Sequence, residues 1–364
     1  MCGVPHRKFA RAKYALKTRY TPLSQKRRAL PVGPNYQPRK GNFAHGCLPN
    51  FLGIGSLRCG STWLYQVLKC HPDIKLSDRK EMCFFFFRDM LRHDLDWYEA
   101  HFAPEDGDEP KPVRGEISPE YTRLKAWQVN RIAKLLPNLR LIMTLRHPIE
   151  RVWSQALLEF GYLGGRDVRK ISSIDFLRQV ERARNRLPSD YRRTIEIWSN
   201  AFGRDALHID LFEALQNDPQ SYVNGILRHI GAATPWSIPA QFANSKVHAT
   251  TSLVRQRRDI PELVEWYIAD RLLEPTERLN DLLQGKVANW VDEMREIRGN
   301  TRLSWRILRE LNRTLLALPE RLAYEAYHAV LDLRFWLRWP QLQKGYISNT
   351  RGATNQLSCA SDGG

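Results

Sequence analysis

The sequence predicts an α/β fold of three layers, in which helices flank a central parallel sheet, followed by a C-terminal helical extension. Apolar runs at residues 51–54 and 139–145 each end in a turn, and a helical pattern follows each turn. Two successive strand, turn and helix units imply parallel strands that are covered on both faces. A chain of 364 residues is long enough for one such domain of roughly 250 residues plus extensions.

The first two units have clear local signals. The run at 51–54 precedes a glycine-bearing turn, which is typical of a short buried strand. Apolar side chains then recur at helical spacing over 61–70, and Pro72 closes that helix. The second run, at 139–145, precedes a His-Pro turn and a helix expected over 150–160.

Further elements extend this domain toward the C-terminus. A third strand is expected at 206–212, before a helix that begins after Pro219. Residues 262–283 have a helical pattern that ends near Gly285. These elements place the α/β domain at residues 48–291.

Residues 292–344 are expected to form a helical extension, and residues 345–364 a loose polar tail. The extension begins with an amphipathic stripe made of Leu303, Ile307, Leu308, Leu311, Leu315 and Leu318. An aromatic-rich helix is expected over 323–339. We favour packing of these helices onto the main domain or onto a second copy of the chain. The alternative is contact with a membrane surface through Phe335, Trp336, Arg338 and Trp339.

The formal net charge of +17 is concentrated near the N-terminus. The first 50 residues contain no Asp or Glu and 11 positive charges, which leaves +6 for the remainder. We interpret residues 1–47 as a basic, disordered arm, because its prolines prevent a long helix. Docking of the arm to an anionic membrane or polymer and a transit-like leader are the alternatives. No nucleic-acid motif accompanies the charge, so specific nucleic-acid binding is not expected.

Membrane and redox signals favour a cytoplasmic setting. No stretch approaches the run of about 20 apolar residues that spans a bilayer, and the N-terminus lacks the apolar core of a secretory signal. The six cysteines include no CxxC pair and no metal-ligand spacing, which favours reduced thiols. We therefore expect a cytoplasmic protein, which is peripheral to a membrane if the basic arm docks there.

The turn after the first strand has the spacing of a phosphate-binding loop. Gly55 and Gly60 match the nucleotide motif G-x-x-x-x-G-K-[ST], but Ser61 stands where that motif requires lysine. The cation is instead Arg58, inside the loop. Because backbone N–H groups and the dipole of the following helix attract anions, the turn is predicted to bind a phosphate group.

The strand at 139–145 leads into Arg146, whereas an ATP or GTP enzyme needs an acidic residue there to hold magnesium. An arginine at this place suits a nucleotide that carries an additional phosphate, such as one on the ribose 3′ position. No metal is expected. A small-molecule kinase with a degenerate loop and a catalytically idle anion-binding module are the rival interpretations.

Residues 55–64 resemble the 5′-phosphosulfate loop of sulfotransferases that use 3′-phosphoadenosine 5′-phosphosulfate (PAPS), and residues 145–154 resemble their 3′-phosphate signature R-[DNH]-P-x-x-R-x-x-S. The resemblance implies a P-loop-like fold with PAPS as co-substrate. It assigns the 3′-phosphate to Arg146 and Ser154, with Arg151 either a further donor or a surface residue. It assigns the 5′ side to Arg58, Cys59, Gly60, Ser61, Thr62 and Trp63.

Two more segments resemble the glycosaminoglycan and heparan branch and the bacterial carbohydrate sulfotransferases. Residues 80–85 are similar to K-E-x-x-F-F, and residues 115–121 to G-E-K-S-P-x-Y. The resemblance implies that Glu81 is the catalytic base. The aromatic run at 84–87 is expected to desolvate its carboxylate and raise its pKa. Arg58 is the second catalytic residue, which stabilises charge on the departing 5′-phosphate.

Acceptor contacts are expected from Lys80, Glu116 and Lys246, of which the last lies in a basic stretch after the third strand. For Glu116, a structural role at a strand end is the alternative. Ile117 replaces the lysine of the G-E-K-S-P motif, and Arg58 replaces the loop lysine common in the glycosaminoglycan branch. The expected activity is transfer of a sulfuryl group from PAPS to a hydroxyl or amine, most simply of a saccharide. A lipid headgroup and a small metabolite are the other acceptors considered.

Overall fold

The computed structural model describes residues 46–86, 88–104, 109–243 and 259–359, all of which belong to one compact unit, Lys40–Gly364. The basic arm predicted at 1–47 lies outside the described residues except for its last two positions. The basic stretch that contains Lys246 also lies outside them.

A parallel sheet forms the centre of the domain, as the sequence predicts. Within the described part of the chain, the sheet has five strands in the order β2-β3-β1-β4-β5, and every neighbouring pair is parallel. The strands are β1 (Phe51–Gly55), β2 (Ile74–Leu76), β3 (Val113–Ile117), β4 (Arg140–Leu145) and β5 (Leu207–Leu211). The strands β1, β4 and β5 were predicted; β2 and β3 were not.

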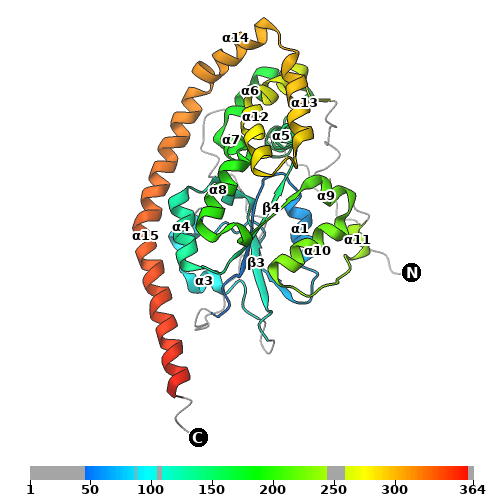
Figure 1. Cartoon of the computed structure of the whole chain (residues 1–364). Coiled ribbons are helices and arrows are strands. Elements are labelled where there is room, and N and C mark those ends of the chain that lie inside the picture. Colours follow the sequence, from blue (N-terminus) through cyan, green and yellow to red (C-terminus); the bar gives the residue numbers. More distant parts are fainter. Residues whose placement is uncertain (1–45, 87, 105–108, 244–258, 360–364) are drawn as a thin grey trace, which may run out of the picture. The chain divides into compact units, whose positions relative to one another are not determined.

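Helices cover both faces of this sheet (Figure 1). Phe51 of β1 and Ile142 of β4 pack with α1 and α10, whereas Leu52 and Leu141 point to the opposite face and pack with α4 and α8. Alternate residues of β1 and β4 therefore enter different cores, which explains why these two strands are mostly apolar. The helices of these two faces are α1 (Ser61–Leu68), α4 (Ala126–Leu135), α8 (Tyr191–Phe202), α9 (Phe212–Asn217) and α10 (Pro219–Ile230).

A second group of helices packs beyond the carboxyl ends of the strands. It has its own apolar core, to which α5, α6 and α12 contribute. The group comprises α5 (Pro148–Leu157), α6 (Ser173–Glu181), α7 (Ala183–Ser189), α12 (Glu262–Leu282) and α13 (Ala288–Gly299). The other short helices and helical turns before residue 300 are α2 (Arg88–Arg92), α3 (Leu95–Glu99), η2 (Pro119–Arg123), η3 (Leu158–Leu163), η4 (Val168–Lys170), η5 (Arg204–Ala206) and α11 (Ala240–Ala243).

The order of the strands reverses beside β1. The chain forms β2 and β3 on one side of β1 and then crosses to form β4 and β5 on the other side. Such a reversal separates the loops that follow neighbouring strands, and ligands of open α/β sheets bind at this point, outside the carboxyl ends of the strands. The loops after β1 and β4 meet there.

The C-terminal extension consists of α14 (Leu303–Leu311), the π-helical turn η7 (Asn312–Leu316) and the long helix α15 (Leu318–Cys359). α15 continues past residue 345, where the sequence suggested the start of a loose tail. Gly345 lies inside the helix, because one glycine costs a helix only about 1 kcal/mol. Among the described residues, no helix is long and apolar enough to cross a membrane.

The amphipathic stripe of the extension is exposed, so it does not pack onto the main domain, which is one of the two partners expected for it. Packing onto a second copy of the chain stays a prediction. Leu303 is 75% exposed and Leu315 is 63% exposed. Phe335 and Trp339 were assigned to the alternative membrane contact, but both are buried against the domain. Their rings face Trp127 and Arg131 of α4. The apolar stripe and the domain-packing face of the extension therefore consist of different residues.

Candidate active site

The loop between β1 and α1 has the backbone geometry of an anion-binding turn. Gly60 is the N-cap of α1 and has a left-handed backbone with φ 82°. A Cβ at this position would lie 2.6 Å from the Cδ2 of Leu215 and 3.2 Å from the ring of Phe212, so the loop packs directly against α9. The other end of the loop is fixed by Ser56, whose Oγ donates to the carbonyl of Pro188 over 2.9 Å.

The end of β4 delivers Arg146 to the same place. Its Nη1 donates to the carbonyl oxygen of Arg58 over 3.2 Å, and its guanidinium lies 4.6 Å from the ring centroid of Phe212. Its Nε and Nη2 donate to Glu150, one turn into α5, each over 3.1 Å. Arg146 is therefore positioned by both the phosphate loop and the helix that follows it.

Two further arginines complete a cluster around this point. Arg58 donates from Nε to the Oγ of Ser154 over 3.0 Å. Arg151 is fully buried, and its Nε and Nη2 donate to Ser189 and Asn185 of α7. The alternative surface role of Arg151 is thus wrong, because α7 covers its side chain.

The electrostatics of the cluster favour an anion. Burial lowers the pKa of Arg58, and the positive charge of Arg146 lowers it further, while the nearby carboxylate of Glu81 raises it. Burial and the charge of Arg146 likewise lower the pKa of Arg151. Burial raises the pKa of the Cys59 thiol to about 11, so the thiol is neutral and offers these cations no compensating charge. Because the three guanidinium groups repel one another, binding of an anionic ligand would lower their electrostatic energy.

One buried N–H donor in the cluster is available to hydrogen-bond such a ligand. The Nη1 of Arg151 is buried and has no hydrogen-bond partner among the described residues. Buried donors are normally paired, and an unpaired one costs about 1–3 kcal/mol. The same holds for the indole Nε1 of Trp63, whose side chain is 8% exposed. The cluster and its glycine turn can therefore accept an anionic ligand.

Comparison with known proteins agrees with this architecture. A solved structure of a sulfotransferase from Alicyclobacillus acidocaldarius matches the fold with a TM-score of 0.50, over 66% of this chain and 98% of that one, at 21% identity. Residues 116–237 match the profile of the sulfotransferase family. This match covers about a third of the chain. The expected P-loop-like α/β fold is thereby confirmed.

Several curated proteins that the chain resembles are named as sulfotransferases. The chain is similar to the membrane-associated sulfotransferase kil1 of Dictyostelium discoideum, with 35% identity over 109 residues, which are 30% of this chain and 22% of that protein. Human carbohydrate sulfotransferase 15 matches with 29% identity over 31% of this chain and 29% of its own length. The human bifunctional heparan sulfate N-deacetylase/N-sulfotransferase 3 matches with 27% identity over 50% of this chain and 22% of its own. The chain thus spans less than a third of each of these relatives.

The base predicted from the sequence lies near Arg58 of the arginine cluster. Glu81 has a left-handed backbone with φ 57°, and its N–H donates to the carbonyl of Ile117 at the end of β3. Its carboxylate is 34% exposed and pairs with Lys80 over 2.5 Å. Phe84 and Phe85 are buried in the core instead of covering this carboxylate, and residue 87 lies outside the described residues. The Glu81 carboxylate is thus partly exposed, and its desolvation by the aromatic run stays a prediction.

Glu116 occupies a different environment, at the end of β3. Its carboxylate is completely buried and accepts hydrogen bonds from Ser118 (2.7 Å), Tyr98 (2.8 Å), Tyr121 and the backbone N–H of Cys83 (3.2 Å). Burial raises its pKa, and the hydrogen bonds from the hydroxyl groups oppose that rise. These contacts support the structural alternative for Glu116, in which it fixes the segment that carries Glu81.

The residues at the start of α1 differ in their exposure. Cys59 is buried, Ser61 is half-buried and Thr62 is exposed, so Ser61 and Thr62 are accessible at the helix N-terminus. Lys246 lies outside the described residues, and its assigned acceptor role stays a prediction.

Sequence reasoning missed the residues that support the cluster from α7 and α8. The hydroxyl of Tyr191 accepts from the backbone N–H of Arg146 and donates to its carbonyl oxygen over 2.7 Å. Ser189 and Asn185 hold Arg151. These residues lie more than 30 positions from either phosphate motif and carry no local signal, so only the fold brings them to the site.

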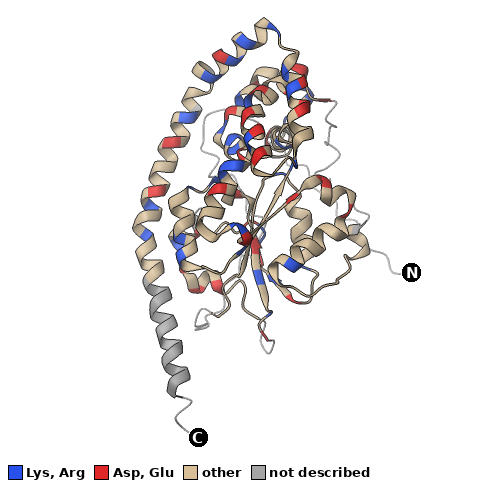
Figure 2. Ribbon diagram, in the orientation of Figure 1, with Lys and Arg blue, Asp and Glu red and all other residues tan. Residues whose placement is uncertain are grey.

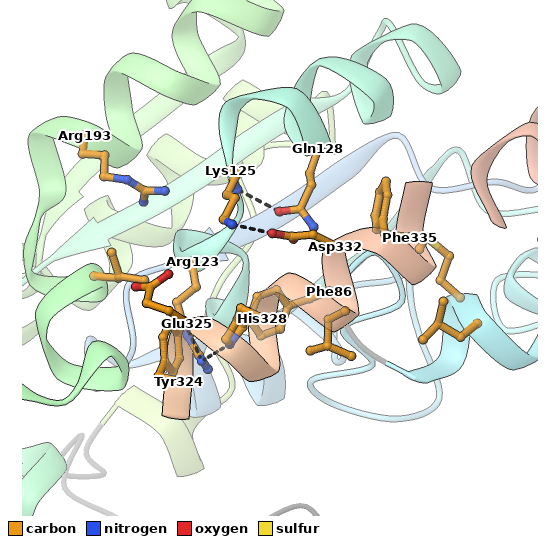
Figure 3. A pocket seen from close by; sticks show the side chains of 14 residues that line it. Phe86, Arg123, Lys125, Gln128, Arg193, Tyr324, Glu325, His328, Asp332 and Phe335 are labelled. Atoms are coloured by element: carbon orange, nitrogen blue, oxygen red, sulfur yellow. Dashed lines mark hydrogen bonds and ion pairs between the residues drawn. The ribbon is translucent and has the colours of Figure 1, made fainter. Parts of the chain in front are cut away.

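A cavity of about 110 Å³ lies elsewhere, between η2, α4 and α15 (Figure 3). None of the site residues predicted from the sequence lines it. Arg123 of η2 donates to Tyr324 of α15, and Lys125 pairs with Asp332 of the same helix. Burial, reinforced by the charges of Arg123 and Lys125, lowers the pKa of His328 to about 4, so its ring is neutral at neutral pH. The cavity therefore belongs to the contact between α15 and the domain.

The described residues contain no group of three or more His, Cys, Asp or Glu side chains that could hold a metal ion.

Proposed function

We propose that the protein transfers a sulfuryl group from PAPS to a hydroxyl or amine of a saccharide. The observation that carries this proposal is the cluster of Arg58, Arg146 and Arg151 with Ser154 at the carboxyl end of the sheet. Two phosphate-binding signatures supply these residues, one after β1 and one after β4. Sulfotransferases characteristically take their sulfuryl group from PAPS, a nucleotide with phosphates at its 5′ and 3′ positions, and such a cluster suits it.

Different residues of the chain would bind the 3′ side and the 5′ side of the nucleotide. Arg146 and Ser154 would hold the 3′-phosphate, since a guanidinium fork pairs well with phosphate oxygens. Arg58 and the backbone N–H groups from Cys59 to Thr62 would hold the 5′ side at the positive end of α1. Arg151, whose Nη1 has no partner among the described residues, adds positive charge beneath both positions.

The chemical step requires alignment and charge stabilisation more than covalent work by the protein. The bond from sulfur to the bridging oxygen of the 5′-phosphate breaks as the acceptor oxygen or nitrogen bonds to sulfur. Arg58 stabilises the negative charge that develops on the departing phosphate. Glu81 accepts the proton that the acceptor loses, and Lys80 orients the Glu81 carboxylate through the ion pair between them.

Two relatives support a saccharide as the acceptor, because their names specify carbohydrate and heparan sulfate sulfotransfer. A lipid headgroup or a small metabolite is the second possibility for the same chemistry. An assay with acceptors of each class distinguishes them.

The direct test incubates the full chain with PAPS that carries labelled sulfate, together with unsulfated glycosaminoglycan chains, a total lipid extract or simple phenols. We expect label to move to the saccharide chains and to require Arg58, with Arg58→Ala as the blank. Transfer to lipid alone would refute the saccharide acceptor and leave the donor assignment standing. Absence of transfer to every class, together with absence of nucleotide binding, would refute the sulfotransferase activity.

A further inference from the structure

The helix α15 has two apolar faces, and only one of them packs on the domain. On the packed face, Phe335 and Trp339 are buried, and the ring of Phe335 lies 5.0 Å from that of Trp127 in α4. Polar contacts hold the same face: Lys125 pairs with Asp332, and Arg123 donates to the hydroxyl of Tyr324 over 3.2 Å (Figure 3). These contacts fix the rotation of α15 about its axis.

The opposite face carries a continuous row of exposed apolar side chains, which we call the apolar ridge. It consists of Leu318, Leu322, Val330, Leu333, Trp336 and Leu337, which are 46–62% exposed. Their spacings of three, four and eight residues place them on one side of a helix, and Ala326 and Ala329 occupy the positions between them. The ridge spans 20 residues, or roughly 30 Å at 1.5 Å per residue.

The preceding segment extends the exposed apolar surface. α14 and η7 expose Leu303, Ile307, Leu311 and Leu315 at successive intervals of four residues, with exposed fractions of 43–75%. Soluble monomers rarely expose a contiguous apolar patch of more than a few hundred Å², and larger ones mark interaction surfaces. Ten large apolar side chains, each about half exposed or more, make this segment such a surface.

The charges beside this surface favour one partner. Arg306, Arg313 and Arg334 are exposed along the same helices, and Figure 2 shows basic residues there interspersed with acidic ones. Residues 303–343 contain six Arg and four Asp or Glu, which gives this segment a net charge of +2. Residues 51–364 carry a net charge of +6 and the whole chain carries +17. A second copy with this charge would be repelled, whereas an anionic lipid surface would be attracted.

We propose that α14 and α15 bind an anionic lipid surface through the apolar ridge. An amphipathic helix with an apolar face, adjacent arginines and an interfacial tryptophan binds in the plane of the headgroups, with its apolar side chains in the acyl boundary. Trp336 supplies the tryptophan of the ridge. This binding is independent of the proposed sulfuryl transfer, because the ridge shares no residue with the arginine cluster.

Vesicle flotation of the full chain tests this inference. The probes are vesicles of phosphatidylcholine alone and of phosphatidylcholine with phosphatidylserine. The ridge variant carries Leu322→Gln, Leu333→Gln and Trp336→Gln. The matched control carries Tyr162→Gln, Leu163→Gln and Ile174→Gln, three side chains that are 42–62% exposed outside the extension. Both variants keep the basic N-terminal arm, so its contribution cancels.

We expect the parent and the matched control to float with the phosphatidylserine vesicles. The ridge variant should bind about a hundredfold more weakly, since three roughly half-exposed apolar side chains no longer leave water. Replacing Arg306, Arg313 and Arg334 by glutamine should weaken binding by up to about a hundredfold at low salt, since each basic side chain near an anionic surface contributes about a factor of five.

A second readout does not depend on the triple variant. Brominated lipid should quench part of the tryptophan fluorescence of the parent chain, and Trp336→Phe should remove that part. Equal flotation of parent and ridge variant, or quenching unchanged in Trp336→Phe, would overturn the proposal. So would sedimentation that shows a dimer abolished by the ridge variant while vesicle binding persists, because a second copy would then cover the ridge.

Discussion

The Nε of Arg58 donates a hydrogen bond to the Oγ of Ser154 over 3.0 Å. The two residues lie 96 positions apart in the sequence, one in the loop after β1 and the other in the helix after β4. Arg146 adds a second link between the same segments, because its Nη1 donates to the carbonyl of Arg58. In the proposed function these links place the cation of the 5′ side and the hydroxyl of the 3′ side next to each other.

Replacing Arg58 by alanine should lower kcat for sulfuryl transfer about 10²–10³-fold, since one preorganised donor to a developing charge contributes this much. Arg58→Lys should retain part of the activity, because lysine keeps the charge but not the planar fork. Initial rates with saturating PAPS measure both variants. Parent-like turnover in Arg58→Ala would exclude Arg58 from the chemical step.

Replacing Glu81 by glutamine should lower kcat about 10²–10⁴-fold, the usual contribution of a positioned general base. Affinity for the nucleotide should be unchanged, because the assigned role concerns the acceptor proton only. If Glu81→Gln instead weakens nucleotide binding and leaves kcat intact, Glu81 is an electrostatic partner of Arg58 and not the base.

Gly60→Ala should destabilise the protein by about 2–4 kcal/mol, from a left-handed backbone and a contact with Leu215. A Cβ at Gly60 would lie 2.6 Å from that side chain. Gly165→Ala is the matched control, because Gly165 also has a positive φ of 63°, but a Cβ there would have no neighbouring atom within 4 Å. Urea unfolding of both variants separates the two effects. Equal destabilisation would mean that the contact with α9 contributes nothing.

Glu181 should make the stability of the helical group dependent on pH. Burial by itself would raise its pKa, but the charge of Arg271 and hydrogen bonds from Arg321 and Tyr267 outweigh burial and lower it. A carboxyl with a lowered folded-state pKa stabilises the protein above its ordinary pKa of 4.5, and this contribution is lost as the pH falls through the folded value.

Glu181→Gln should therefore reduce the free energy of unfolding by about 2 kcal/mol at pH 7 and by less below pH about 4. Urea titrations at both pH values measure the difference. Glu196→Gln, in an exposed pair with Arg192, is the control and should have little effect. A deficit for Glu181→Gln that stays constant with pH would contradict the ion-pair explanation.

The fold could be predicted where strands are apolar throughout. β1, β4 and β5 were identifiable because each is a run of mostly large apolar residues. β2 is only three residues long, and β3 contains Arg114 and Glu116. The hydroxyl groups of Tyr98 and Tyr121 make a buried carboxylate tolerable in β3, and no local pattern shows those partners.

The candidate site was predictable to the extent that its residues lie in contiguous motifs. Arg58, Arg146 and Ser154 come from two such motifs, and the structure brings them into contact. The burial of Arg151 depends on α7, which has no motif. The exposure of the apolar stripe in α14 was also unpredictable, because an amphipathic pattern does not specify its partner.

The most direct measurement compares the binding of 3′-phosphoadenosine 5′-phosphate with that of 5′-AMP by calorimetry, using the full chain and the Arg146→Ala and Ser154→Ala variants. A proposed 3′-phosphate site at these residues predicts that the bisphosphate binds the parent far more tightly than 5′-AMP does. It also predicts that Arg146→Ala removes most of that preference and Ser154→Ala part of it. Equal binding of the two nucleotides by the parent, or tighter binding of ATP with magnesium, would contradict the proposed donor.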